Sequence, residues 1–233
     1  KNKKQYYSYK IKKKSGGFRE IKAPKKKLKE LQLQILSQLE KIYKVRKGAH
    51  GFIENKSIVT NASLHVGKNI VFNLDLQDFF PTISFGRVKK LFMSYPLNLT
   101  NDIATVLAQI CCVNGCLPQG SPTSPIISNM ICYKMDNDLF SLSINNACTY
   151  SRYADDITFS FTKKIGNIPK DIVFFDENNQ VKIGDKLTKL IADHGFSVNY
   201  NKVRLKDRKQ RQEVTGLTVN DRVNIKRNFI KKT

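Results

Sequence analysis

The sequence predicts an α+β fold in which an antiparallel sheet is backed by helices, and three patterns favour it. Apolar and small polar residues alternate in two short runs, 148–153 and 157–161, on either side of an acidic turn, as they do in a β-hairpin. A third alternating run covers residues 69–76. Apolar residues recur at helical spacing between about residues 25 and 44, which is typical of a helix that packs on one face.

The N-terminal part is predicted to form a basic hairpin followed by that helix. Residues 6–11 and 18–21 are expected to be strands joined by a lysine-rich turn at 12–17. The helix should expose its lysines and bury an apolar face. That face consists of Leu28, Leu31, Ile35, Leu39 and Ile42.

The 69–76 strand places a carboxylate among apolar side chains. Ile70, Phe72 and Leu74 share one face by alternation, so Asp75 lies on the other face. Because a buried carboxylate without a partner is costly, a cation is expected beside it. The alternative is that Asp75 caps the strand end or forms an ion pair.

Residues 153–156, with the sequence Tyr-Ala-Asp-Asp, form the acidic turn between the two short strands. The turn brings two carboxylates together, and their repulsion is relieved when a divalent cation binds both. If the 69–76 strand is a neighbour, Asp75 completes a set of three carboxylates that suits two-metal nucleotidyl transfer. A polymerase is therefore the first functional hypothesis. The alternative is a solvated turn, because aspartate favours turns for local reasons.

The remaining elements are predicted from capping and turn signals. Helices are expected to start near Ser84, near Thr100 and after Ser121, the last reaching about Ser143, and to back the sheet. Residues 163–185 are polar and turn-rich, which indicates a surface excursion. The last predicted elements are a helix at 184–194 and a hairpin of residues 214–219 and 222–225 that turns at Asn220 and Asp221.

Cysteine and histidine are not expected to take part in the chemistry. The five cysteines lie in apolar or helical stretches and are expected to be reduced core thiols. Cys111, Cys112 and Cys116 have no histidine or second cysteine pair at ligand spacing, so a zinc site is not expected. His65 is expected to be a structural, hydrogen-bonded histidine.

The net charge of +22 is unevenly distributed. Residues 1–50 carry 17 Lys and Arg against 3 acids, residues 51–200 carry 13 against 13, and residues 201–233 carry 11 against 3. Basic ends around a neutral centre indicate a polyanionic partner that the flanks grip. A membrane surface fits less well, because no amphipathic stretch accompanies the lysines. The sequence shows neither a signal peptide nor a bilayer-spanning apolar run, so a cytoplasmic protein is expected.

Three motifs stand in order along the chain: DLQDFF at 75–80, LPQGSPTSP at 117–125 and YADD at 153–156. They resemble, in turn, the first palm motif, the LPQGxxxSP motif and the YxDD box of the reverse transcriptase family. Two further stretches, NASLH at 61–65 and VTG at 214–216, resemble the NAxxH and VTG motifs of bacterial retron reverse transcriptases.

The resemblance implies a right-hand polymerase fold with fingers and palm subdomains. Residues 1–66 would form the fingers, and residues 67–213 the palm, with fingers elements interleaved near 84–116. Residues 214–233 would form a hairpin like the primer grip and the start of a thumb that is absent from this chain.

The resemblance also assigns roles to individual residues. Those expected to be catalytic and to hold two Mg²⁺ ions are Asp75, Asp155 and Asp156. Those expected to bind the nucleotide are Arg19, Phe80, Gln119, Gly120 and Lys202. Those expected to take part in RNA recognition, through the retron motifs, are Asn61, Ala62, His65, Val214, Thr215 and Gly216.

Three of the nucleotide-binding assignments have a physical reason. The ring of Phe80 would clash with a ribose 2′-hydroxyl and so select deoxynucleotides; alternatively, Phe79 and Phe80 are core aromatics. Gly120 would let the backbone of the 117–125 loop approach a ligand closely, because glycine has no Cβ. Lys202 would act as a general acid toward pyrophosphate.

The function implied is that of a retron reverse transcriptase. Such an enzyme makes multicopy single-stranded DNA from deoxynucleoside triphosphates on a structured noncoding RNA, primed by a guanosine 2′-hydroxyl. It would act in antiphage defence with an effector protein as partner. One alternative is another bacterial reverse transcriptase, of the group II intron, diversity-generating or abortive-infection type. The other is a non-catalytic RNA-binding scaffold, whose hallmark would be loss of a metal carboxylate.

Overall fold

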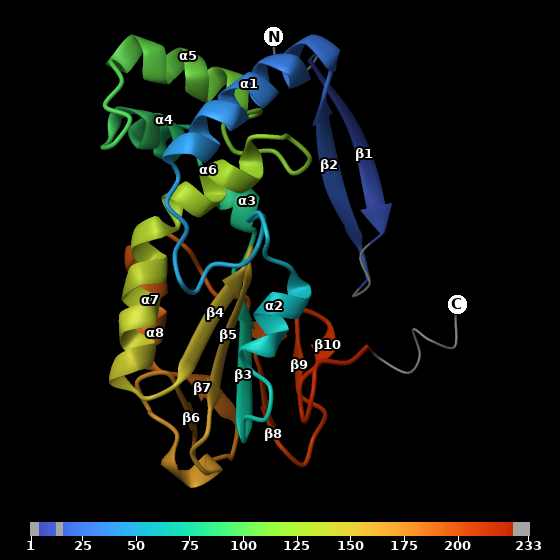
Figure 1. Ribbon diagram of the computed structural model, residues 1–233, viewed down its shortest axis with the longest axis vertical. Helices are drawn as coiled ribbons and strands as arrows, with labels where there is room; N and C mark the ends of the chain where they lie inside the picture. The colour runs from blue at the N-terminus through green and yellow to red at the C-terminus, as the bar shows by residue number, and fades with distance from the viewer. Residues whose placement is uncertain (1–4, 13–15, 226–233) are drawn as a thin grey trace. The chain divides into compact units, whose positions relative to one another are not determined.

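The structure is a computed structural model that describes residues 5–12 and 16–225 (Figure 1). The chain divides into two compact units, each made of two separate segments. Residues 1–44 and 78–132 make up the first unit, and residues 45–77 and 133–233 the second. The fingers and palm boundaries predicted at residues 66 and 213 do not coincide with these divisions, and the assignment of subdomains stays a prediction.

The first unit begins with the predicted hairpin. Strands β1 (Tyr6–Lys12) and β2 (Phe18–Pro24) pair antiparallel, with Tyr6 opposite Pro24 and Lys12 opposite Phe18. Residues 13–15 of the predicted turn lie outside the described residues. The strands are confirmed.

The long helix of the first unit, α1 (Lys26–Ile42), is confirmed, but part of its predicted buried face is wrong. Leu31 is 47% exposed, whereas its neighbour Gln32 is completely buried. Gln32 is accommodated because its amide donates to Tyr6 Oη at 2.9 Å and to the Ile110 carbonyl at 2.8 Å. A polar side chain with such partners can occupy a core position that hydrophobic periodicity assigns to an apolar one.

The first unit contains four further helices among its described residues. Ser84 caps its helix as predicted, accepting a hydrogen bond from the Arg87 amide. The prediction that the helices starting near Ser84 and Thr100 back the sheet is wrong, because both belong to the first unit and the four-stranded sheet belongs to the second. These helices are α3 (Phe79–Thr82), α4 (Phe85–Met93), α5 (Asn101–Cys111) and α6 (Ser124–Ile131).

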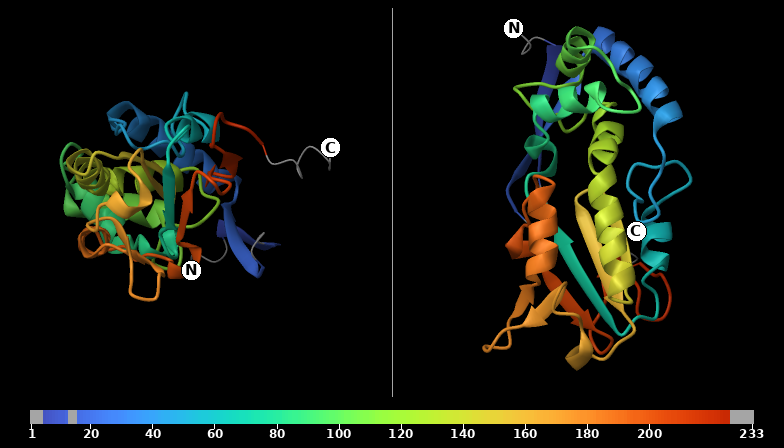
Figure 2. Two further views of the ribbon diagram at one scale, coloured as in Figure 1. Left: turned by 90° about the horizontal axis from the view of Figure 1, so that it is seen from below. Right: turned by 90° about the vertical axis from the view of Figure 1, so that its left-hand side faces the viewer.

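The second unit is built on an antiparallel sheet with the strand order β4-β5-β3-β8. Helices α7 and α8 lie side by side along one face of it (Figures 1 and 2). The predicted α+β fold, with an antiparallel sheet backed by helices, is confirmed. The bounds are β3 (Ile70–Asp75), β4 (Thr149–Tyr153), β5 (Asp156–Phe161), β8 (Arg204–Asp207), α7 (Tyr133–Asn145) and α8 (Asp185–Asp193).

The helix predicted from about residue 121 to 143 is interrupted at Cys132. Helix α6 ends at Ile131 and α7 begins at Tyr133. Neither glycine nor proline stands at the break, so the sequence carries no signal for it.

The two faces of the sheet differ in character. Phe72 and Phe159 are directly opposite each other on the face toward α7, and both are completely buried. The other face carries polar residues, including Asn73 and Thr158, whose side chains are joined by a hydrogen bond of 2.9 Å. Alternation along the strands therefore places the apolar core under the helices and leaves the carboxylates of β3 and β5 on the polar face.

The C-terminal hairpin differs from its prediction. Strands β9 (Glu213–Val214) and β10 (Leu217–Thr218) pair directly across a turn at Thr215 and Gly216. Both turn residues have positive φ, 48° and 83°, the conformation that a two-residue hairpin loop of type I′ requires. The chain also reverses at the predicted turn around Asn220 and Asp221, because Asn224 pairs antiparallel with Thr218 beyond a bend at 220–222. Residues 222–225 form only this isolated bridge, so the strand predicted there is wrong.

The second unit also contains smaller elements, including two 3-10 helices, η2 (Ile165–Asn167) and η3 (Tyr200–Lys202). The predicted surface excursion contains a short hairpin whose turn lies at 176–179. The other small elements are α2 (Ile58–Ser63), β6 (Val173–Phe175) and β7 (Val181–Ile183).

Within the described residues, no helix has the length and apolar character needed to cross a membrane.

Candidate active site

The three predicted catalytic aspartates lie at the same end of the sheet in the second unit. Asp75 is the last residue of β3 and Asp156 is the first residue of β5, and the two are directly opposite each other. Asp155 lies in the turn before Asp156, and its carbonyl accepts a hydrogen bond of 3.0 Å from the amide of Leu76. Residues about eighty positions apart in the sequence are therefore held together by backbone pairing.

A lysine neutralises part of this charge. The Lys202 ammonium lies 2.8 Å from Oδ2 of Asp75, and Asp75 is only 5% exposed. The Asn199 amide also donates to the Asp75 carbonyl at 2.8 Å, which fixes the segment that carries Lys202. The ion pair considered as the alternative for Asp75 is thus present, and the role of Asp75 as a metal ligand stays a prediction.

Asp156 shows the electrostatic consequence of the crowded carboxylates. Desolvation by surrounding atoms, and then the charges of Asp155 and Asp75, raise the pKa of Asp156 to about 7. The nearby Lys202 and Arg204 act in the opposite direction. Asp156 keeps an exposed surface, so the repulsion from its two neighbours is the part of the shift that a bound cation would remove.

The three carboxylates are chemically suited to bind a divalent cation, although their side chains are not arranged around a single ion position. Within residues 5–12 and 16–225, no three His, Cys, Asp or Glu side chains converge closely enough to hold an ion. Carboxylate oxygens are nevertheless the ligands that Mg²⁺ prefers, and the charges of Asp155 and Asp75, which add to desolvation in raising the pKa of Asp156, are charges that an ion would neutralise. Asp75, Asp155 and Asp156 are the residues that would hold it.

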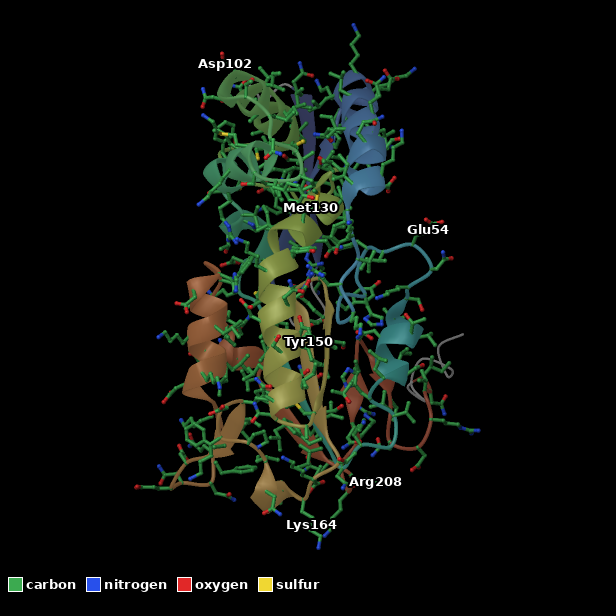
Figure 3. The ribbon with its side chains drawn as sticks, turned by 60° about the vertical axis from the view of Figure 1, so that its left-hand side comes forward. Glu54, Asp102, Met130, Tyr150, Lys164 and Arg208 are labelled. Atoms are coloured by element: carbon green, nitrogen blue, oxygen red, sulfur yellow. The ribbon has the colours of Figure 1, made fainter. Side chains whose placement is uncertain are left out.

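A buried ion pair beside the acidic turn was not predicted. Arg152 in β4 and Asp136 in α7 face each other at 2.7 Å, and both side chains are fully buried. Tyr150 donates to the same carboxylate at 2.7 Å; Figure 3 shows Tyr150 alongside α7. The available signal was an arginine at a position that alternation places on the buried face of its strand, two residues after Tyr150.

The 117–125 loop is fixed within the first unit. The Gln119 carbonyl accepts a hydrogen bond of 2.7 Å from the Lys22 amide in β2. Gly120 has a φ of 109°, and a Cβ there would lie 2.7 Å from Cγ2 of Ile21. Gly120 was expected to allow close approach of a ligand, whereas the close neighbour in the structure is β2 of the same unit.

The other two predicted nucleotide-binding residues also lie in the first unit. Arg19 is exposed on β2, opposite Ile11. The ring of Phe80 packs edge-on against Phe79, with centroids 5.3 Å apart, and the two residues are 9% and 3% exposed. Phe79 is therefore a core aromatic, and the proposed sugar-gate role of Phe80, like the role of Arg19, stays a prediction.

The two motifs expected to recognise RNA pack against each other. Ala62 from the first motif and Val214 from the second join Val71 in one buried hydrophobic cluster. In addition, the Thr215 hydroxyl donates to the Ile58 carbonyl at 3.1 Å. The motifs are about 150 residues apart in the sequence but form one packed element of the second unit.

Four of the six motif residues are buried, and the part of these motifs in RNA recognition stays a prediction. These four are at most 1% exposed, so their side chains pack the interior and do not present a surface to RNA: Asn61, Ala62, His65 and Val214. The His65 ring bridges the hydroxyls of Ser160 and Ser151 at 2.7 and 2.8 Å. Burial, followed by nearby positive charge, lowers the pKa of His65 to about 3, so it is the structural histidine that was predicted. Contact with RNA stays a prediction for Thr215 and Gly216.

Comparisons with known proteins agree with the motifs. Residues 11–219 match the family described as reverse transcriptase (RNA-dependent DNA polymerase). The chain is 33% identical to the retron Mx65 reverse transcriptase of Myxococcus xanthus, over 95% of this chain and 53% of that protein. It is also 33% identical to the retron Ec86 reverse transcriptase of Escherichia coli, over 92% of this chain and 63% of that protein. The chain thus spans between about half and two thirds of the length of these relatives.

Solved structures show the same fold at low sequence identity. A telomerase from Candida tropicalis has a TM-score of 0.57 at 14% identity, and covers 97% of this chain and 49% of its own. A telomerase from Candida albicans, solved with a fragment of telomeric RNA, has a TM-score of 0.55 at 13% identity, over 93% of this chain and 45% of its own. The polymerase fold expected from the motifs is therefore present.

Proposed function

Since the chain belongs to the reverse transcriptase (RNA-dependent DNA polymerase) family, we propose that it carries the catalytic part of a retron RNA-directed DNA polymerase. The observation that supports this most directly is the register that places Asp75 opposite Asp156, with Asp155 in the adjoining turn. Relatives named retron reverse transcriptases match more than nine tenths of this chain, which favours the retron type.

The proposed reaction joins a deoxynucleotide to a primer. The primer hydroxyl oxygen forms a bond to the α-phosphorus, the bond to the leaving pyrophosphate breaks, and the hydroxyl proton passes to solvent water. Two Mg²⁺ ions held by Asp75, Asp155 and Asp156 would activate the hydroxyl and balance the charge of the triphosphate.

The roles proposed for other residues are those that the family resemblance implies. The Lys202 ammonium, now paired with Asp75, is a proton donor for the departing pyrophosphate once that pairing is released. Arg19, Gln119 and Gly120 are proposed to bind the nucleotide, and Phe80 to exclude the ribose 2′-hydroxyl. Thr215 and Gly216 are proposed to contact the RNA.

The substrates proposed are those of retrons. The template is a structured noncoding RNA, the primer is a guanosine 2′-hydroxyl within it, and the product is multicopy single-stranded DNA joined to RNA through a branch. The strongly basic ends of the chain suit such a polyanion, so binding should weaken steeply with salt. A role in antiphage defence with an effector protein, in the cytoplasm, completes the proposal.

The test is incorporation of labelled deoxynucleotides by the full-length protein co-expressed with its adjacent noncoding RNA. The control is an Asp155→Asn, Asp156→Asn double variant, which should incorporate nothing. Ribonuclease-resistant label that stays joined to RNA through a branch supports the retron activity. Label on any primed template without a branch would indicate another bacterial reverse transcriptase, and no label from the unaltered protein would indicate a non-catalytic RNA-binding scaffold.

A further inference from the structure

The acidic turn is flanked by a buried ion pair with ideal geometry. Arg152 Nε and Nη2 reach the two carboxylate oxygens of Asp136, each at 2.7 Å. Both side chains are fully buried. The attraction within such a pair offsets little more than the free energy of desolvating its two charges, and a protein with an apolar pair of similar volume is often as stable or more stable. Fold stability alone therefore gives no clear reason for a charged pair at this place.

The third nitrogen of the Arg152 guanidinium suggests why a charged pair occurs here. Arg152 Nη1 donates a hydrogen bond of 2.9 Å to the carbonyl of Ala154, the second residue of the turn. The backbone of Arg152 is fixed as well, because its amide donates to Gly48 at 2.8 Å and its carbonyl accepts from His50 at 2.8 Å. The arginine is thus held at both ends and contacts the turn from a rigid position.

The turn needs such support because its backbone is strained. Ala154 has a φ of 57°, in the left-handed region that costs a residue with a side chain about 1–2 kcal/mol. Strain of this kind persists only where the surroundings enforce it. The backbone at Gly51 also packs closely on the turn, because a Cβ there would lie 2.4 Å from the Ala154 amide nitrogen.

The conformation of Ala154 determines where the carboxylates point. Asp155 follows it directly, and the Asp155 carbonyl accepts the amide hydrogen of Leu76, the residue after Asp75. Asp156 then opens β5 opposite Asp75. A shift of Ala154 would therefore move two of the three carboxylates relative to the third.

We propose that Arg152 is a positioning residue: clamped by Asp136, its guanidinium holds the Ala154 carbonyl so that Asp155 and Asp156 face Asp75. This inference rests on the proposed function, because it assigns a purpose to the turn as a cation-binding element. The role requires a planar fork with several fixed donors, which lysine cannot replace at the same charge.

The test compares Arg152→Lys with two control variants in the full-length protein. Tyr150→Phe removes the other donor to Asp136 but leaves the contact with Ala154 intact. Leu139→Ala opens a cavity at a fully buried position of α7 and lowers stability without touching the turn. A second test variant, Asp136→Leu with Arg152→Met, replaces the pair by apolar residues and is expected to fold.

Three quantities are measured: Mn²⁺ binding by electron paramagnetic resonance without nucleotide, hydrogen exchange of the Leu76 amide, and steady-state deoxynucleotide incorporation. Arg152→Lys and the apolar double variant should weaken Mn²⁺ binding by about 10- to 100-fold and lower kcat by a similar factor. The KM for deoxynucleotide should stay within about threefold, and the Leu76 amide should exchange about tenfold faster. Both controls should stay within about twofold of the unaltered protein in Mn²⁺ affinity.

Several outcomes would overturn the positioning role. Mn²⁺ affinity and Leu76 exchange that are unchanged in both test variants would show that the turn keeps its conformation without the guanidinium. An equal loss of affinity in Leu139→Ala would show that general destabilisation is the cause. Failure of the proposed function is distinguishable: the unaltered protein would then incorporate no nucleotide, while the effects of Arg152→Lys on Mn²⁺ binding and Leu76 exchange would still report on positioning.

Discussion

The 117–125 loop of the first unit and the 153–156 turn of the second each form hydrogen bonds with buried polar side chains. The side chains that contact the loop are neutral, whereas those that support the turn are charged. Behind the loop, Gln32 accepts a hydrogen bond of 2.7 Å from the Ser121 hydroxyl and donates to Tyr6 and to a backbone carbonyl. All of these groups are neutral. Behind the turn, a buried arginine and a buried aspartate carry full charges.

The neutral hydrogen-bond network and the buried ion pair differ in how much stability is lost when one side chain is removed. A neutral network that loses one side chain leaves unpaired hydrogen-bonding groups, at about 1–3 kcal/mol for a buried group. A buried ion pair that loses one partner leaves an uncompensated charge, which costs about 3–5 kcal/mol. Removal of one supporting side chain should therefore cost more stability at the turn than at the loop.

The largest effect is expected for Asp136→Ala in the second unit. The unfolding free energy should fall by about 3–5 kcal/mol, because Arg152 would remain buried without its counter-ion. Urea denaturation with a common m-value measures this. In the double variant Asp136→Leu, Arg152→Met most of the loss should disappear, and a loss below about 1 kcal/mol in Asp136→Ala would mean that solvent or another group compensates the arginine.

A smaller effect is expected for Gln32→Leu in the first unit. The substitution fits a buried site but leaves the Tyr6 hydroxyl, the Ile110 carbonyl and the Ser121 hydroxyl without their partner, so the loss should be about 1–3 kcal/mol. Gln34→Leu is the matched control, because Gln34 is exposed on the same helix, and it should change stability by less than about 0.5 kcal/mol. If Gln32→Leu destabilises as much as Asp136→Ala, the proposed contrast between neutral and charged support is wrong.

Glycine substitutions test the close backbone packing of both regions. Gly51→Ala forces a Cβ against the Ala154 backbone, and Gly120→Ala adds one at a φ of 109° against Ile21. Each should cost about 1–3 kcal/mol, and Gly51→Ala should also weaken Mn²⁺ binding because it displaces the turn. Gly166→Ala, which meets no atom within 4 Å, serves as the control in thermal unfolding. Equal Mn²⁺ affinity in Gly51→Ala and Gly166→Ala would contradict a role for the turn's conformation.

The sequence was sufficient for the strands that carry the carboxylates. Alternation located β3, β4 and β5, and an acidic turn between apolar strands located Asp155 and Asp156. These features depend on neighbours along the chain, which a sequence records. The motif resemblance then related Asp75 to the turn, and the register of β3 and β5 shows the two side by side.

The features that were missed depend on partners distant in the chain or on rare backbone conformations. Gln32 is buried because Tyr6 and Ile110 satisfy its amide, which helical periodicity cannot reveal. Arg152 pairs with Asp136 across a helix and a strand. The turn at Thr215 was overlooked because threonine rarely adopts positive φ, whereas the Asn-Asp sequence at 220–221 is a stronger local turn signal.

The smallest expected effect is a pH dependence that comes from the carboxylates of the second unit. Because the folded pKa of Asp156 is raised to about 7 from an ordinary value of 3.8, the folded state binds more protons between those two values. The contribution of Asp156 to stability therefore decreases as pH rises from about 4 to 7. The lowered pKa of His65 acts in the opposite direction below about pH 6.5, so the total curve mixes the two.

The difference between the unaltered protein and Asp156→Asn isolates the carboxylate. Melting temperatures measured from pH 4.5 to 7.5 should show that the advantage of the asparagine variant grows with pH, since asparagine does not ionise. Mg²⁺ should reduce that advantage, because it favours the ionised carboxylate that repulsion from Asp155 and Asp75 now disfavours. A difference that is independent of pH would mean that Asp156 is already ionised at pH 4.5, and that Lys202 and Arg204 neutralise the three carboxylates more fully than the burial and spacing of these residues indicate.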